Sequence, residues 1–183
     1  MTYLIGAVII VGLLCLLDLL LTVGIMRRLR AHSRQLSKRS EVGRPDHSMI
    51  SVGSEVGAFN AQAIDDILVS DTTMGDDALI AFLTPTCAPC VESVPKFVEL
   101  AKEWYAGHRN VLSVVVGARE DATEMVSALG SVGSVTVEDH TGPLTSAFSV
   151  KLFPSFCRVK RDGDRLVVAE HIDIDNTSAT AAS

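Results

Sequence analysis

The N-terminal part of the chain differs from the rest in its pattern of apolar and polar positions. Residues 4–26 are almost entirely apolar, with Asp18 as the only charge, and a helix of this length can cross about 30 Å of hydrocarbon. A cleaved secretory signal would begin with basic residues and end in a small-residue cleavage site. This run has no Lys or Arg before it and ends in two arginines, so we predict a transmembrane helix over residues 3–26.

Beyond residue 50, apolar runs of strand length alternate with segments that have helical patterns. The apolar runs, which are typical of strands buried on both faces, predict strands over residues 78–83, 111–116 and 134–138. A β-hairpin is predicted where the runs 155–160 and 165–169 flank Asp162-Gly163. A short strand or two is expected within residues 63–69.

Three segments are predicted to be helices, over residues 88–105, 120–129 and 144–148. In the first, apolar residues repeat at intervals of three and four, and Pro95 should kink it. The second has acids in its first turn and Gly130 just after its end. Strands alternating with helices predict an α/β fold with a largely parallel centre and an antiparallel hairpin at its edge.

Charge is distributed unevenly along the chain. Six of the sixteen Lys and Arg residues lie directly after the apolar run, within residues 27–39, whereas nineteen acids face nine Lys and Arg from residue 51 onward. The acidic part argues against nucleic acid as a partner. Residues 27–50 are interpreted as a basic linker, either lying against anionic membrane lipid or simply polar. A soluble domain over residues 51–171 and a flexible tail over 172–183 complete the predicted organisation.

Two of the four cysteines, Cys87 and Cys90, form a C-x-x-C. The number and spacing of the cysteines do not fit a disulfide-stapled scaffold or a four-thiolate zinc site, and we expect no metal. The motif lies where a predicted strand ends and a predicted helix begins. A thiol at a helix N-terminus faces unpaired N–H groups and the positive end of the helix dipole, which favour the thiolate.

This position predicts a thiol–disulfide exchange site. Cys87 would attack a partner disulfide, and Cys90 would resolve the mixed disulfide. The expected redox group is the Cys87–Cys90 disulfide itself, with no other cofactor. Cys157 is expected to be a buried structural cysteine, while Asp139 and His140 are interpreted as turn formers.

The C-x-x-C and its surroundings resemble the active-site stretch of the thioredoxin superfamily. The similar segment reads Ala81-Phe82-Leu83-Thr84-Pro85-Thr86-Cys87-Ala88-Pro89-Cys90. Pro95 matches the kinked active-site helix of that superfamily, and residues 151–156 resemble the loop that carries its cis-proline. Residues 53–59 resemble the lead-in of TlpA-like, membrane-anchored members, and the apolar helix with its basic collar is closest to the MauD proteins of methylamine utilisation.

The resemblance implies a thioredoxin-like fold, with a central mixed sheet flanked by helices, and a membrane-anchored thiol–disulfide oxidoreductase acting on a protein disulfide or dithiol. It also implies that Pro154 is cis and lies against the disulfide, with Phe153 facing the substrate. Residues next to the cysteines would support the site, namely Thr86, Ala88 and Pro89. Ala81 stands where many thioredoxins keep a buried acid.

Two other functions are compatible with this fold. A peroxiredoxin-type peroxidase would have proline where Ile80 stands, and a metal-binding assembly factor would have C-x-x-x-C and a histidine.

Cys15 lies one turn before Asp18 on the same side of the apolar helix, where an acid costs about 3 kcal/mol. Cys15 and Asp18 either contact a membrane redox partner or are polar residues that a very apolar helix tolerates.

Two arguments about the side of the membrane on which the domain lies conflict. Basic residues after the helix place the domain in the cytoplasm by the positive-inside rule. The resemblance places it outside, where a tethered dithiol has the most disulfides to make and mend. We expect a single-pass cell-membrane protein with an extracytoplasmic domain.

Overall fold

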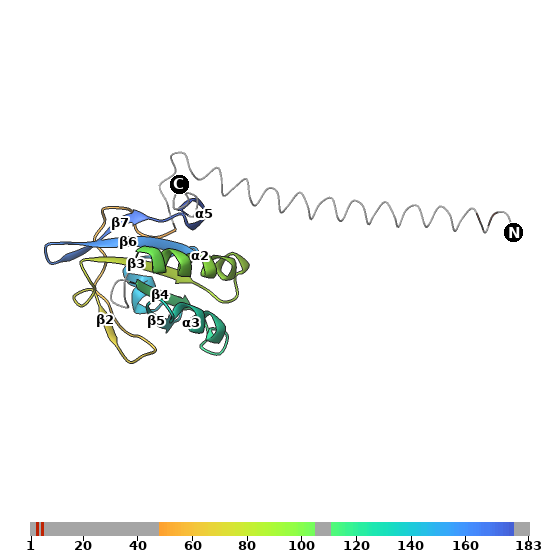
Figure 1. Ribbon diagram of the computed structural model, residues 1–183, viewed down its shortest axis with the longest axis horizontal. Coiled ribbons are helices and arrows are strands. Elements are labelled where there is room, and N and C mark those ends of the chain that lie inside the picture. The colour runs from red at the N-terminus through yellow and green to blue at the C-terminus, as the bar shows by residue number, and fades with distance from the viewer. Residues whose placement is uncertain (1–2, 4, 6–47, 105–110, 178–183) are drawn as a thin grey trace. The chain divides into compact units, whose positions relative to one another are not determined.

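The computed structural model describes residues 3, 5, 48–104 and 111–177. The chain divides into two units, Met1–Pro45 and Asp46–Ser183, and the strands and helices labelled in Figure 1 belong to the second. Within the described ranges, no helix is long and apolar enough to cross a membrane. The helix predicted over residues 3–26 lies outside these ranges apart from Tyr3 and Ile5, and so does the predicted linker up to residue 47.

A five-stranded mixed sheet forms the centre of the second unit, with the strand order β5-β4-β3-β6-β7. Its strands are β3 (Asp77–Leu83), β4 (Val111–Val116), β5 (Ser134–Glu138), β6 (Ser155–Asp162) and β7 (Arg165–His171). β3, β4 and β5 are parallel, whereas β6 is antiparallel to both β3 and β7. The predicted α/β fold with a parallel centre and an antiparallel edge is confirmed.

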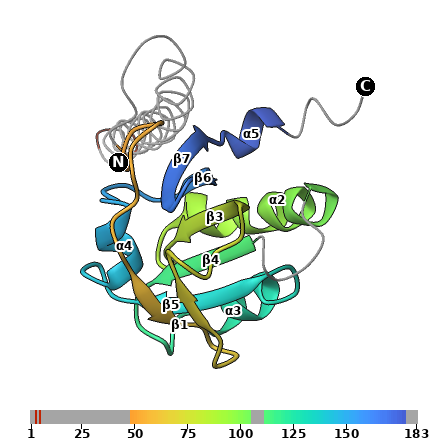
Figure 2. The ribbon, with the colours of Figure 1, turned by 90° about the vertical axis from the view of Figure 1, so that its left-hand side faces the viewer.

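Helices cover both faces of this sheet. They are α2 (Ala88–Trp104), α3 (Thr123–Leu129), α4 (Pro143–Ala147) and α5 (Ile174–Thr177). Figure 2 shows α2 and α3 on one side of the sheet and α4 on the other. α2 continues through Pro95, whose ring lies on the solvent side of the helix.

Side chains alternate along the strands, so β3 contributes to two separate apolar layers. Leu79 and Leu83 lie in the layer beneath α2 and α3, together with Phe97. Ile80 and Phe82 lie in the opposite layer, which α4 and the N-terminal residues of the domain cover. Each of these β3 side chains is fully buried, which explains the continuous apolar run in the sequence.

The N-terminal strands form a sheet of their own. β1 (Asn60–Gln62) pairs antiparallel with β2 (Leu68–Ser70). The strand expected within residues 63–69 is therefore found only at its C-terminal end. Ala63 accepts the N–H of Asp66 and donates to Ile67, and Asp66 has φ of +62°, so the intervening residues form a turn.

The packed domain extends beyond both predicted boundaries. At the N-terminal end, Met49 is only 5% exposed, although it was assigned to the linker. At the C-terminal end, Ile174 is also 5% exposed and packs in the layer beneath α2, although it was assigned to the flexible tail. Apolar side chains at both ends account for the difference, because each covers part of a sheet face that longer elements leave open.

Two element boundaries differ from the sequence prediction. α3 begins at Thr123 and not at residue 120, because residues 119–122 form turns and no side chain caps the helix start. In the β6–β7 hairpin, Asp162 pairs with Arg165, which leaves a two-residue turn one position later than predicted. Gly163 in this turn has φ of +62°, a conformation that glycine adopts without steric cost.

Candidate active site

The C-x-x-C lies at the junction that its sequence context predicts. β3 ends at Leu83 and α2 begins at Ala88, so Cys87 is the residue immediately before the helix. Its carbonyl accepts the N–H groups of Cys90 at 3.0 Å and Val91 at 3.1 Å, while its own N–H donates to Thr84 at 3.3 Å. The half-buried Cys87 sulfur therefore lies at the N-terminus of a seventeen-residue helix, where the helix dipole favours negative charge.

Cys90 lies one turn further along α2 in very different surroundings. It is fully buried in the apolar layer between α2 and the sheet. Burial raises the pKa of Cys90 to about 12; the Thr84 backbone N–H lowers it, while a hydrogen bond to the Cys87 side chain and the charge of that side chain raise it. Cys90 thus stays protonated at neutral pH and hydrogen-bonds to the Cys87 sulfur.

The loop before Cys87 is held by a close contact with the end of β4. Gly117 follows β4 with φ of +155°, and a Cβ atom there would lie 3.3 Å from Cδ of Pro85. The hydroxyl groups of Thr84 and Thr86, the residues on either side of this proline in the sequence, lie 3.2 Å apart. Glycine at 117 allows the active-site loop to pack directly against the neighbouring parallel strand.

The loop before β6 lies beside the C-x-x-C because of the sheet register. β3 and β6 are antiparallel with Phe82 opposite Ser155, so continuing the register by one residue places Pro154 next to Leu83. The Phe153–Pro154 peptide bond is cis, the isomer that the resemblance implied. Phe153 is half-buried and packs against both apolar layers, including the one to which Cys87 and Cys90 belong.

The remaining predicted site residues form the exposed rim of this site. Thr86, Ala88 and Pro89 are all exposed. Two apolar side chains join them, Val91 at 51% exposure on α2 and Leu152 at 61% next to Phe153.

His140 belongs to the surroundings of the site, although the sequence analysis treated it only as a turn former. Its ring packs edge-on against Phe153, with 5.7 Å between ring centroids. The turn that holds it is fixed by Asp139, which accepts hydrogen bonds from the N–H and hydroxyl of Thr141 at 2.7 and 2.8 Å. The sequence signal that could have identified His140 is its position at the carboxyl end of β5, which runs parallel to β4 and β3. Ligands often bind at the carboxyl ends of parallel strands.

Ala81 stands at the position where, as the resemblance implies, many thioredoxins keep a buried acid. It is fully buried in the same layer as Cys90. No carboxylate is among the groups that shift the Cys90 pKa.

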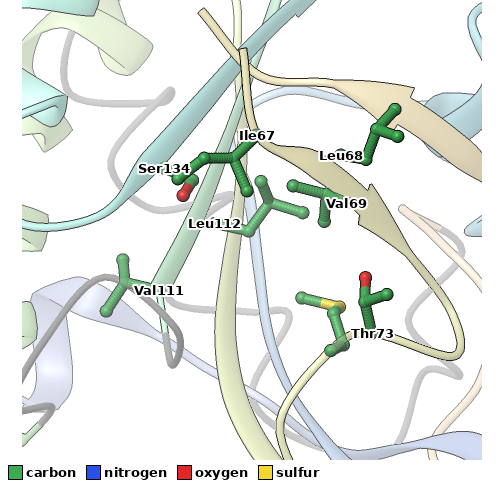
Figure 3. A pocket seen from close by; sticks show the side chains of 8 residues that line it. Ile67, Leu68, Val69, Thr73, Val111, Leu112 and Ser134 are labelled. Carbon is green, nitrogen blue, oxygen red and sulfur yellow. The ribbon is translucent and has the colours of Figure 1, made fainter. Parts of the chain in front are cut away.

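The described pocket lies away from the cysteines. It has a volume of about 340 Å³ and is lined by Ile67, Leu68, Val69, Thr73, Met74, Val111, Leu112 and Ser134 (Figure 3). β4 and β5 begin there, whereas Cys87 follows the opposite end of β3. Within the described part of the chain, no three His, Cys, Asp or Glu side chains are grouped to hold a metal ion.

Comparison with known proteins gives matches in structure only. No family model matches the chain, and no curated protein matches its sequence. The thioredoxin domain of a thiol-disulfide oxidoreductase from Bacteroides vulgatus matches with a TM-score of 0.54 at 14% identity, over 72% of this chain and 97% of that chain. A thiol:disulfide interchange protein from Bacteroides sp. matches with a TM-score of 0.55 at 17% identity, over 72% and 88%.

This chain has the thioredoxin fold. A secreted Mycobacterium tuberculosis disulfide oxidoreductase, homologous to E. coli DsbE, shares it with a TM-score of 0.50 at 19% identity, over 68% of this chain and 94% of that chain. These structural neighbours are thiol–disulfide oxidoreductases, and the predicted thioredoxin-like fold is confirmed. Within this thioredoxin fold, Cys87, Cys90 and the cis-Pro154 loop lie together, while the closer likeness to MauD proteins stays a prediction.

Proposed function

We propose that this chain is a membrane-anchored thiol–disulfide oxidoreductase that exchanges disulfides with a protein partner through Cys87 and Cys90. The observation that carries the proposal is the contrast between the two thiols. Cys87 is half-buried at a helix N-terminus, and Cys90 is a fully buried, protonated thiol hydrogen-bonded to it. With this contrast, Cys87 is available to attack the partner disulfide, while Cys90 remains protonated until it resolves the mixed disulfide.

In the reducing direction, the reaction begins at Cys87. Its thiolate attacks one sulfur of the partner disulfide, forming a Cys87–partner disulfide and releasing the other partner sulfur as a thiolate, which takes up a proton. Cys90 then loses its proton and attacks the Cys87 sulfur. This step forms the Cys87–Cys90 disulfide and releases the second partner thiol, so two electrons and two protons pass to the partner. In the oxidising direction the same steps run in reverse.

Formation of the mixed disulfide itself activates Cys90. Both the charge on Cys87 and the hydrogen bond to it raise the Cys90 pKa. When the Cys87 sulfur becomes part of a disulfide it carries no charge, so its contribution to the raised pKa disappears. The pKa of Cys90 is therefore lower in the mixed disulfide than in the free dithiol, although burial, its largest cause, still raises it.

Substitution of each cysteine tests the proposal. Cys87→Ser should abolish insulin reduction, because no sulfur remains to attack the partner. Cys90→Ser should leave the attack intact and accumulate Cys87–partner adducts, which mass spectrometry of membranes would identify. Cys157→Ala removes a buried thiol elsewhere and serves as the control, with activity retained. Reduction that survives Cys87→Ser would overturn the proposal.

The two alternative functions can be separated with the same protein. A peroxiredoxin-type peroxidase would consume peroxide in a Cys87-dependent reaction faster than it reduces insulin. A metal-binding assembly factor would bind copper with an affinity that Cys87→Ser abolishes, without reducing insulin. Insulin reduction without these two activities is the result expected for an oxidoreductase.

The membrane anchor is part of this proposal. The apolar run of residues 4–26, which carries one charge, supports it. The six basic residues after this run also support it, because they can bind anionic lipid headgroups. We place the soluble domain on the extracytoplasmic side, where protein disulfides persist. A membrane redox partner in contact with Cys15 and Asp18 would complete the electron path.

A further inference from the structure

The loop that carries the cis-proline is hydrogen-bonded to the segment where the domain begins. The carbonyl of Ser48 accepts the N–H groups of Lys151 at 2.7 Å and Leu152 at 3.3 Å. The N–H of Ile50 donates to the carbonyl of Phe148 at 2.9 Å. In Figure 2 the orange N-terminal segment passes beside α4, which leads into this loop. Residues 48–50 thus form a backbone support along residues 148–152.

Side chains fix the same segment from its other sides. Met49 is 5% exposed and lies in the apolar layer against which Val150 and Phe153 pack. The Nε2 atom of His171, on β7, lies 2.9 Å from the carbonyl oxygen of Ile50. The segment is therefore held by β7 and by the core, and it holds the loop in turn.

We propose that residues 48–50 position Phe153 and Pro154 for a protein substrate, with Met49 as the positioning residue. This inference rests on the proposed oxidoreductase function. A peptide bound in extended form pairs with backbone groups of the loop beside the site, so its affinity depends on where the loop is held. A small disulfide needs only the Cys87 sulfur, and its reaction does not depend on the loop.

The matched pair of substitutions is Met49→Ala and Met74→Ala in the full chain. Both methionines lie in the same apolar layer, at 5% and 7% exposure. Met74 precedes β3 and so lies at the opposite end of that strand from Cys87. The two substitutions remove the same atoms from the same layer and should lower the thermal midpoint by similar amounts. Met49 lies between Ser48 and Ile50, whose backbone groups hydrogen-bond to residues 148–152.

The readout is the Michaelis constant for insulin reduction beside the rate of reaction with a small aromatic disulfide. Met49→Ala should raise KM for insulin about fivefold, because a shifted loop weakens binding before it affects chemistry. It should leave the small-disulfide rate unchanged. Met74→Ala should change neither, and Met49→Leu, which conserves volume, should restore the KM.

Each other outcome has a distinct meaning. An unchanged KM in Met49→Ala, or an equal rise in Met49→Ala and Met74→Ala, would overturn the positioning role while leaving the oxidoreductase function intact. A fall in the small-disulfide rate of Met49→Ala would also overturn it, since the effect would then lie at Cys87. A wild-type protein that reduces neither substrate would instead contradict the proposed function.

Discussion

Cys87 and Cys90 are three residues apart but differ in access to solvent. Cys87 is half-buried at the start of α2, while Cys90 is fully buried and its pKa is raised to about 12. Only Cys87 is placed to meet the sulfur of a partner. The proposed order of the two exchange steps rests on this difference within the first turn of one helix.

This difference predicts selective alkylation of the reduced protein. At about pH 8, iodoacetamide should label Cys87 and leave Cys90 and Cys157 unlabelled, because alkylation requires an accessible thiolate and both of these thiols are fully buried. Peptide mass spectrometry over a time course measures the order in which the three cysteines are alkylated. Denaturant should make all three react. Equal labelling of Cys87 and Cys90 in the folded protein would contradict the assignment.

Asp77 on β3 and Arg158 on β6 form an ion pair with two hydrogen bonds. The guanidinium Nε donates to the carboxylate at 2.6 Å and a second nitrogen bonds to its other oxygen. The hydrogen bond to Arg158 lowers the pKa of Asp77 below its ordinary value of 3.8. A lowered folded-state pKa stabilises the protein above that ordinary value, and the stabilisation is lost as pH falls below it.

We therefore expect Asp77→Asn to reduce stability in a pH-dependent way. Near pH 6 the variant should be less stable by about 0.5–1 kcal/mol, a small value because the pair is partly exposed to solvent. The difference should shrink as the pH is lowered through the acidic range below 3.8. Urea unfolding at several pH values measures it. A difference that is constant with pH would exclude this linkage.

At the scale of elements, the sequence predicts the central strands best. β4 and β5 begin and end at the predicted residues, because polar or glycine residues bound their apolar runs in the sequence. The ends of the domain were placed too narrowly, since single apolar residues such as Met49 and Ile174 give no periodic signal. Their burial depends on contacts with residues far away in the sequence.

The same limit applies to the candidate site. The C-x-x-C and the cis-proline loop could be identified because each is a local motif. His140 follows the end of a predicted strand, but its contact with Phe153, like the hydrogen bonds of Ser48 to residues 151 and 152, arises only when β5, β6 and the N-terminal segment meet in space. A local pattern carries no information about such long-range contacts.

The short helix α5 provides a test at this scale. Ile174→Ala should reduce the free energy of unfolding by about 2–4 kcal/mol, because a buried side chain is removed from the layer beneath α2. Lys96→Ala removes the exposed ion pair between Lys96 and Asp175 and should cost less than about 1 kcal/mol. Urea unfolding compares the two. Equal small effects would show that residues 172–177 act as a loose tail.

For the whole molecule, the proposed orientation in the membrane leads to a test with two reporters. Alkaline phosphatase matures only after export, so its fusion to the C-terminus should be active if the domain lies outside. A green fluorescent protein fusion at the same place should then be dark. A silent phosphatase with a bright fluorescent fusion would place the domain in the cytoplasm, in agreement with the positive-inside rule.

The central sheet also separates the thiols of the domain. Cys157 on β6 lies in the apolar layer beneath α4, and Cys90 lies in the layer beneath α2. The backbone between these layers prevents the two sulfurs from meeting once the protein has folded. In the unfolded chain nothing keeps them apart, so refolding under oxidising conditions would yield scrambled Cys90–Cys157 and Cys87–Cys157 species. Formation of the sheet before oxidation would then favour the proposed Cys87–Cys90 disulfide over these two species.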